Sequence, residues 1–289
     1  MSVIARLPLL CLALSLLGSS EAAPPPESAE PSPSPAAAAK PSEDTGHVPK
    51  LLSGIDRIQE KLRKVPGRTG ILAEESRYSL FGEELIIRDF FGDRRGGFFL
   101  DVGCAWPIRA NNTYYLEKHL GWRGVGIDAL EDYAGSWARD RPNSTFVHAL
   151  VDERTRGDAT FFKSGEMGLS SAERYRADGR HFGGSLSVEE LRIPTTSLDD
   201  LLDRLGVVSV DLVALDIEGH ELKALRGLDL DRFRPGLIVA EGRRPKIERY
   251  MSAQGYEVIE RYLPFDPVNT YYQRRVVPAA KASQESTSP

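Results

Sequence analysis

The chain has 289 residues, of which 41% are hydrophobic and 27% are charged, and its formal net charge is -5. This length is enough for one large α/β domain with a full core. The charge balance provides no basic surface of the kind that nucleic-acid binding requires, so DNA and RNA are not expected as partners.

The N-terminus has the layout of a secretory signal peptide. In "MSVIARLPLLCLALSLLGSSEAA", one arginine precedes a short apolar run that small residues follow. The run is shorter than the about 20 residues that comfortably span a membrane, and the charges around it favour export. We therefore expect a signal peptide over residues 1–23, cleavage near Ala22 or Ala23, and an exported mature chain without a membrane span. The alternative is an uncleaved N-terminal anchor.

Residues 24–46 are rich in Pro, Ala, Ser and Glu and contain no large apolar residue, which predicts a disordered linker. An N-terminal helical segment is expected over 47–76, because apolar residues between Leu51 and Leu62 have helical spacing. The stretch "YSLFGEELIIRDFF" repeats this spacing as a second helix. The catalytic-sized domain is expected over 77–277 and a disordered tail over 278–289. Removal of the signal leaves Cys104 as the single cysteine, so an internal disulfide is excluded.

From Phe98 onward, apolar strands alternate with amphipathic helices. Strands such as "VDLVALD" and "PGLIVAE" are apolar on both faces, as in a buried parallel sheet. The stretches "YEVIERY" and "VNTYYQRR" are expected to pair as a terminal antiparallel hairpin. The fold class is therefore α/β, a Rossmann-like, doubly wound, mostly parallel seven-stranded sheet with a terminal antiparallel hairpin. The expected strands are 98–103, 124–128, 145–150, 210–216 and 236–241, and the expected helices are 111–120, 131–139, 197–205, 220–226 and 245–253.

Residues 163–190 are rich in Gly and Ser and exceed the usual length of a connection. This composition predicts a mobile loop near a functional site. The alternative is a surface insertion without a function.

Acidic residues stand at the carboxyl ends of the expected strands, where open parallel sheets bind their ligands. Each of them alone is also explained as the cap of the following helix. Together they indicate a ligand site, and they are Asp101, Asp128, Asp152, Asp216, Glu218 and Glu241.

The first turn, "DVGCAWP", has one glycine where a dinucleotide-binding turn has GxGxxG, so a pyrophosphate ligand is disfavoured. A nucleoside without phosphates needs one close backbone approach, at Gly103, and an acid for its ribose hydroxyls, at Asp128. A cationic ligand also benefits from the acidic rim. S-adenosylmethionine meets these demands, and its expected contacts are Asp101, Gly103, Cys104, Asp128, Ala129 and Asp152.

Three stretches, "FFLDVGCAWPIRANNTYYLEKHLGWRGVGIDA", "IPTTSLDDLL" and "VDLVALDIEGHELKALRG", resemble the FkbM-type methyltransferases, a class I S-adenosylmethionine-dependent family. The resemblance covers about residues 77–262. The turn "GCAWPIRANNT" and the histidine of "DIEGHE" depart from the usual family pattern. The resemblance implies O-methylation of a hydroxyl on a sugar, a glycan or another small molecule.

Methyl transfer to a hydroxyl calls for a base at the cleft, and Asp216 and His220 are the first candidates, followed by Glu218. Alternatively, these three side chains hold a divalent metal ion, or His220 is an ordinary solvated helix residue. Two other functions stay open at this point. One is an exported binding protein without catalysis, and the other is an NAD-dependent oxidoreductase.

Overall fold

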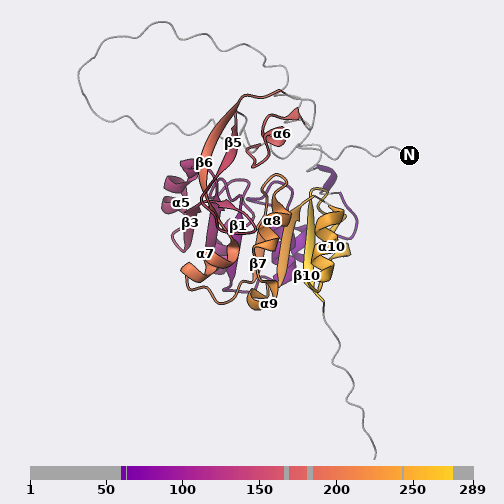
Figure 1. Cartoon of the computed structure of the whole chain (residues 1–289). Coiled ribbons are helices and arrows are strands. Elements are labelled where there is room, and N and C mark those ends of the chain that lie inside the picture. The colour runs from indigo at the N-terminus through magenta and orange to yellow at the C-terminus, as the bar shows by residue number, and fades with distance from the viewer. Residues whose placement is uncertain (1–59, 63, 166–168, 181–184, 243, 276–289) are drawn as a thin grey trace, which may run out of the picture.

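The computed structural model describes residues 60–62, 64–165, 169–180, 185–242 and 244–275 (Figure 1). A seven-stranded sheet in the order β3-β2-β1-β7-β8-β10-β9 forms its centre. All neighbouring pairs from β3 to β8 are parallel, whereas β10 runs antiparallel to both β8 and β9. The predicted fold class is thereby confirmed. The strands of this sheet are β1 Phe98–Val102, β2 Arg123–Asp128, β3 Ser144–His148, β7 Leu212–Leu215, β8 Leu237–Glu241, β9 Tyr256–Val258 and β10 Asn269–Arg274.

Both faces of the central strands are buried, because successive side chains of a strand point to opposite faces. In β1, Leu100 packs in the cluster that includes residues of α7, α8 and α10, while Phe99 packs with residues of α3 and α4. The helices are α3 Glu83–Phe91, α4 Tyr114–Leu120, α5 Ala134–Asp140, α6 Arg174–Ala177, α7 Leu198–Arg204, α8 Glu221–Arg226, α9 Leu230–Phe233 and α10 Pro245–Ala253, with short 3-10 turns η1 Gly70–Ala73, η2 Glu131–Tyr133 and η4 Glu260–Tyr262.

Residues that the sequence assigned to connections form a second, three-stranded sheet. Its strands β4 Leu150–Val151, β6 Val188–Thr196 and β5 Asp158–Ser164 lie in the order β4-β6-β5. β5 and β6 extend beyond the strand ends of the main sheet, together with α6 (Figure 1). The prediction of a loop over 163–190 is therefore wrong for its described ends, which are paired strands, and for α6. β5 and β6 carry many polar side chains. Their long antiparallel pairing satisfies the backbone hydrogen bonds of both strands.

The N-terminal predictions are tested only in part by the structure. The signal peptide, the linker, the C-terminal tail and most of the first expected helix fall outside the described residues. The second helix starts later than predicted, at Glu83, because Gly82 adopts a left-handed conformation with φ 88°. In the described part of the chain, we find no helix with the length and apolarity needed to cross a lipid bilayer.

Candidate active site

The turn after β1 approaches the end of β7 closely. A Cβ atom on Gly103 would lie 1.9 Å from the carbonyl oxygen of Asp216, and the φ of Gly103 is +79°. Both features require glycine at this position. This contact brings the carboxyl ends of β1 and β7 together, so that the residues after these strands share one cavity with those after β2.

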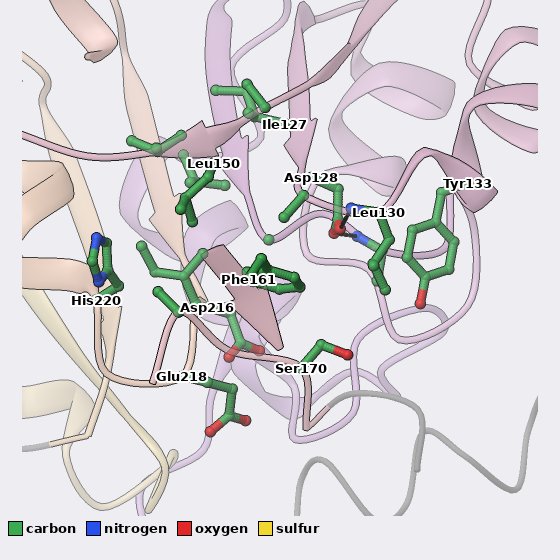
Figure 2. A pocket seen from close by; sticks show the side chains of 18 residues that line it. Ile127, Asp128, Leu130, Tyr133, Leu150, Phe161, Ser170, Asp216, Glu218 and His220 are labelled. Atoms are coloured by element: carbon green, nitrogen blue, oxygen red, sulfur yellow. Dashed lines mark hydrogen bonds between the residues drawn. The ribbon is translucent and has the colours of Figure 1, made fainter. Parts of the chain in front are cut away.

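The cavity has a volume of about 740 Å³ including its open mouth. One part of its wall is apolar and comes from both sheets. Figure 2 shows Asp128 and His220 on opposite sides of this cavity, with Asp216 and Glu218 between them. The apolar wall consists of Ile127, Leu130, Ala149, Leu150, Val151, Phe161 and Ala172.

Asp128 ends β2 and has a carboxylate that two backbone N–H groups hold in place. Ala105 N donates to Oδ2 at 3.0 Å and Leu130 N donates to Oδ1 at 2.9 Å. Burial raises the pKa of Asp128 to about 6, although these two hydrogen bonds oppose the shift. Each carboxylate oxygen keeps a second lone pair with which it can accept a hydrogen bond from a ligand hydroxyl.

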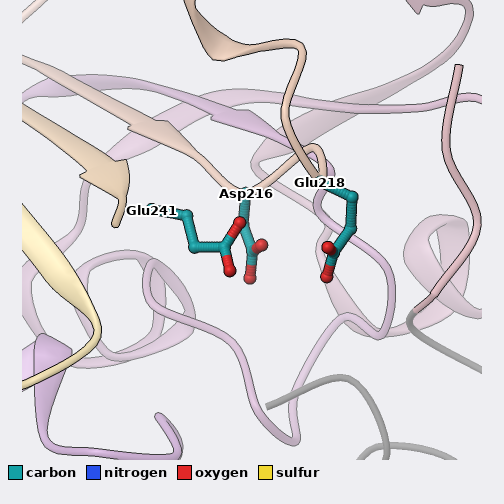
Figure 3. Close-up of side chains that lie close together, drawn as sticks. All are labelled: Asp216, Glu218 and Glu241. Atoms are coloured by element: carbon teal, nitrogen blue, oxygen red, sulfur yellow. The ribbon is translucent and has the colours of Figure 1, made fainter. Parts of the chain in front are cut away.

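Three carboxylates gather at the ends of β7 and β8 (Figure 3). Asp216, Glu218 and Glu241 each present an oxygen within 4.8 Å of the others. Asp216 follows β7, Glu241 ends β8, and Glu218 adopts a left-handed φ of 51°. Burial, and next the charge of Glu241, raise the pKa of both Asp216 and Glu218 well above the ordinary range. Such carboxylates bind protons readily.

Two arginines partly compensate this negative charge. Arg244 pairs with Glu221 and donates to Glu241 at 3.2 Å. Nη1 of Arg176 lies 3.8 Å from Glu218. No hydrogen bond or ion pair reaches the Asp216 carboxylate from the described residues, so it is the member of the cluster that is best placed to contact a ligand.

His220 lies directly before α8 and its ring contributes to the cavity wall. Its Nε2 atom has no hydrogen-bond partner among the described residues, and Oδ1 of Asp152 is 3.7 Å away. The residue is only 5% exposed, so it is not the solvated helix residue considered as an alternative. Burial, and next the charge of Lys223, lower the pKa of His220, which keeps the ring neutral near pH 7.

The structure gathers six of the nine predicted site residues around the cavity, namely Gly103, Asp128, Ala129, Asp216, Glu218 and His220. The other three, Asp101, Cys104 and Asp152, are buried residues that do not line it. The Asp101 carboxylate accepts hydrogen bonds from Thr113 Oγ1 at 2.7 Å and Asn111 Nδ2 at 3.1 Å, and Cys104 is buried. Asp152 accepts the N–H of Glu153 at 2.7 Å and faces His220.

Several lining residues were not identified from the sequence, and they include Tyr133, Phe161 and Ser170. Phe161 belongs to β5, which was assigned to a connection. The alternation of Ala159 and Phe161, both of which pack in the same apolar cluster, was the available signal for this strand. The candidate metal ligands also differ from the predicted set. Asp216 and Glu218 lie close to Glu241, and His220 does not belong to this group of three.

Comparison with protein families gives one match that covers the cavity. The family described as "Methyltransferase FkbM domain" matches residues 101–258. This range contains all the cavity-lining residues that the sequence identified. A comparison with curated proteins gives no match.

Solved structures of two bacterial enzymes are similar to the chain at low identity. One is a TehB-like SAM-dependent methyltransferase from Corynebacterium glutamicum, with 15% identity, a TM-score of 0.37, and coverage of 78% of this chain and 100% of that one. The other is the 1,6-didemethyltoxoflavin-N1-methyltransferase of Burkholderia thailandensis with bound 1,6-didemethyltoxoflavin and S-adenosylhomocysteine. Its identity is 11% and its TM-score 0.37, and the match covers 83% of this chain and 94% of that one.

Proposed function

Because the chain belongs to the FkbM methyltransferase family, we propose that it transfers the methyl group of S-adenosylmethionine to a hydroxyl of a sugar, a glycan or another small molecule. The family resemblance found in the sequence is confirmed, since the match spans more than half of the 289 residues. The chain is thus an S-adenosylmethionine-dependent methyltransferase and not an NAD-dependent oxidoreductase. The proposal adds the acceptor class and the roles of the residues.

The observation that carries the proposal is the position of Asp128 and Asp216 at two ends of one cavity. Asp128 accepts the ribose hydroxyls of the cofactor, and the apolar wall around Leu150 and Phe161 receives the adenine. The turn at Gly103, which packs closely on Asp216 and lines the cavity, is proposed to lie beside the methionine part. Asp216 and Glu218 would then lie nearest the sulfonium group, whose positive charge favours the ionised form of these carboxylates.

The cofactor supplies a methyl group on a positively charged sulfur. The cavity residues would hold the acceptor oxygen in line for this transfer, and a protein base would take the hydroxyl proton. Positioning of the two reactants is worth up to about 7–11 kcal/mol of the barrier. Asp216 is the first candidate for the base, because its pKa is raised by burial and by neighbouring charge, and the described residues offer its carboxylate no other hydrogen bond. His220, neutral and unpaired at Nε2, is the second.

A neutral acceptor that is rich in hydroxyl groups suits this site. Carboxylates only accept hydrogen bonds when ionised, and sugar hydroxyls donate them. Asp216 and Glu218 face the cavity, whereas Arg244 is engaged with Glu221 and Glu241. An anionic acceptor would meet like charge at this position, which disfavours it.

Glu218 is proposed to bind the acceptor or to serve as a further base beside Asp216. Asp101, Cys104 and Asp152, which do not line the cavity, are proposed to support the cofactor site. A divalent ion held by Asp216, Glu218 and Glu241 is the competing arrangement, since carboxylate oxygens are the ligands that Mg²⁺ prefers. We propose catalysis without a metal ion, so a chelator should leave the turnover unchanged.

We further propose that the chain is exported after removal of residues 1–23. The proposal rests on the sequence of this segment, which lies outside the described residues. N-terminal sequencing of the protein from its native host tests it. An intact N-terminus on cytosolic protein would overturn export.

A direct test uses S-adenosylmethionine that carries ¹³C in its methyl group, together with a panel of neutral methyl glycosides, uronic-acid glycosides and amino-sugar glycosides. We expect labelled O-methyl products from the neutral glycosides and loss of product in Asp216→Asn. Transfer to nitrogen would refute O-methylation. Tight cofactor binding without transfer to any acceptor, including extracts of the host's glycans, would favour the binding-protein alternative.

A further inference from the structure

The turn after β1 adopts a backbone conformation that its own sequence does not favour. Ala105 has φ +40° and Ala110 has φ +50°, in the left-handed region that glycine prefers. Such conformations persist only where surrounding contacts determine them. The turn has one glycine, Gly103, so its shape has to be imposed by other parts of the fold.

Helix α5 and the residue after it supply these contacts. Trp137 Nε1 donates to the carbonyl oxygen of Ala105 at 2.7 Å, and the indole is 1% exposed. Arg141 is fully buried and donates from Nη1 to the carbonyl oxygen of Pro107 at 3.0 Å. Gly126 in β2 leaves room for the indole, because a Cβ atom at this position would lie 2.5 Å from the ring.

Ala105 connects this support to the proposed ribose site. Its carbonyl group accepts the hydrogen bond from Trp137, and its N–H donates to Oδ2 of Asp128 at 3.0 Å. The carbonyl group and the N–H group lie on either side of the Cα atom of Ala105. The hydrogen bond from Trp137 to the carbonyl group therefore restricts the direction in which the N–H group points toward Asp128. We infer that Trp137 is a positioning residue for cofactor binding, which acts on Asp128 through Ala105. The inference rests on the proposed function, in which Asp128 binds the cofactor ribose.

The protonation of Asp128 reports whether this chain of hydrogen bonds is intact. The titratable groups that face Asp128 are Asp101 of β1, Cys104 of the turn, Tyr133 of η2 and His148 of β3. Burial raises the pKa of Asp128 to about 6, and the N–H groups of Leu130 and Ala105 limit the rise. Loss of the Ala105 bond must therefore raise this pKa further and move the pH dependence of cofactor binding upward.

The matched pair Trp137→Phe and Trp122→Phe tests the inference. Trp122 is also buried, and its Nε1 donates to a backbone carbonyl, that of Arg94, at 2.8 Å. Both variants lose one indole N–H and similar volume, so we expect similar losses of Tm. S-adenosylhomocysteine is titrated by calorimetry over roughly pH 5–8, which brackets the Asp128 transition. Trp137→Phe alone should weaken binding roughly tenfold and raise the midpoint of its pH dependence by about one unit.

Equal affinity and equal midpoints in the two variants would overturn the role of Trp137. Failure of the wild-type protein to bind S-adenosylhomocysteine would instead overturn the proposed function. A second pair serves if Trp137→Phe does not fold. Gly126→Ala crowds the indole of Trp137, and Gly124→Ala crowds Phe99, with a Cβ atom 2.4 Å from both its ring and its carbonyl oxygen. The midpoint should rise in Gly126→Ala alone, and an equal response of both variants would contradict the inference.

Discussion

Replacement of Asp128 is expected to weaken cofactor binding, and asparagine is the most informative substitute. The carboxylate accepts backbone N–H groups from Ala105 and Leu130, so Asp128→Ala also removes two bonds that hold the cavity wall. We therefore expect Asp128→Ala to lower Tm as well as affinity. Asp128→Asn retains one oxygen acceptor and a similar shape, and it removes the charge.

The magnitude follows from two ribose hydroxyls that donate to one carboxylate. Hydrogen bonds to a charged group contribute about 1.5–3 kcal/mol each, and water returns part of this when the carboxylate is absent. A net loss of about 1.4–3 kcal/mol in Asp128→Ala corresponds to a rise in Kd of roughly 10- to 150-fold. The Kd of Asp128→Asn should lie between that of Asp128→Ala and that of the wild type.

The pH dependence of binding gives an independent reading of the same residue. Burial raises the pKa of Asp128 to about 6 in the free protein, and the ribose hydroxyls bind best to the ionised form. Wild-type affinity should therefore fall as the pH drops through 6, by up to about tenfold per pH unit below the pKa. Asp128→Asn should lack this dependence.

Calorimetric titration with S-adenosylhomocysteine measures both effects, and Asp211→Asn is the control. Asp211 also accepts a backbone N–H, that of Phe98 at 2.9 Å, but it lies at the opposite end of the sheet. The control should bind like the wild type. If Asp128→Ala binds as tightly as the parent, the assignment of the ribose to Asp128 is wrong.

Three further expectations concern the base, the first turn and the linker. Asp216→Asn and His220→Ala should each keep the Kd of S-adenosylhomocysteine, which has no positive charge on sulfur, within about twofold. Loss of the true base should lower kcat roughly 10²–10⁴-fold in single-turnover assays; unchanged turnover in both variants would refute both candidates. Gly103→Ala should lower Tm by many degrees, because its Cβ would lie 1.9 Å from the carbonyl oxygen of Asp216, and a stable variant would contradict the close approach. Deletion of residues 24–46 should leave Tm unchanged in a thermal melt, whereas a drop of several degrees would mean that the linker packs on the domain.

The main sheet was predictable because its strands are apolar on both faces. "VDLVALD" and "PGLIVAE" become the buried strands β7 and β8, and Asp128 and Asp216 stand at strand ends as expected. The side chain of Ser197 caps α7 by accepting the N–H of Asp200, in agreement with the predicted helix start in "TTSLDDLL". Local patterning thus located the strand ends and the acids that follow them.

Long-range contacts account for most of what the sequence did not reveal. β5 and β6 are partly exposed and carry many polar residues, so the alternation of Ala159 and Phe161 is a weak signal and the stretch resembles a connection. The left-handed Ala105 depends on Trp137, which follows it by a strand and a helix. Asp101 is expected to contact the cofactor, and the sequence did not reveal that Asn111 and Thr113 donate to its Oδ2 atom. The spacing of residues along the sequence does not by itself predict any of these long-range contacts.

The most direct measurement is a crystal structure of the protein with S-adenosylhomocysteine. We expect both ribose hydroxyls to donate to Asp128, the adenine to pack between Leu150 and Phe161, and the sulfur to face Asp216. A ribose bound away from Asp128, or an adenine placed against Asp216 and Glu218, would contradict it.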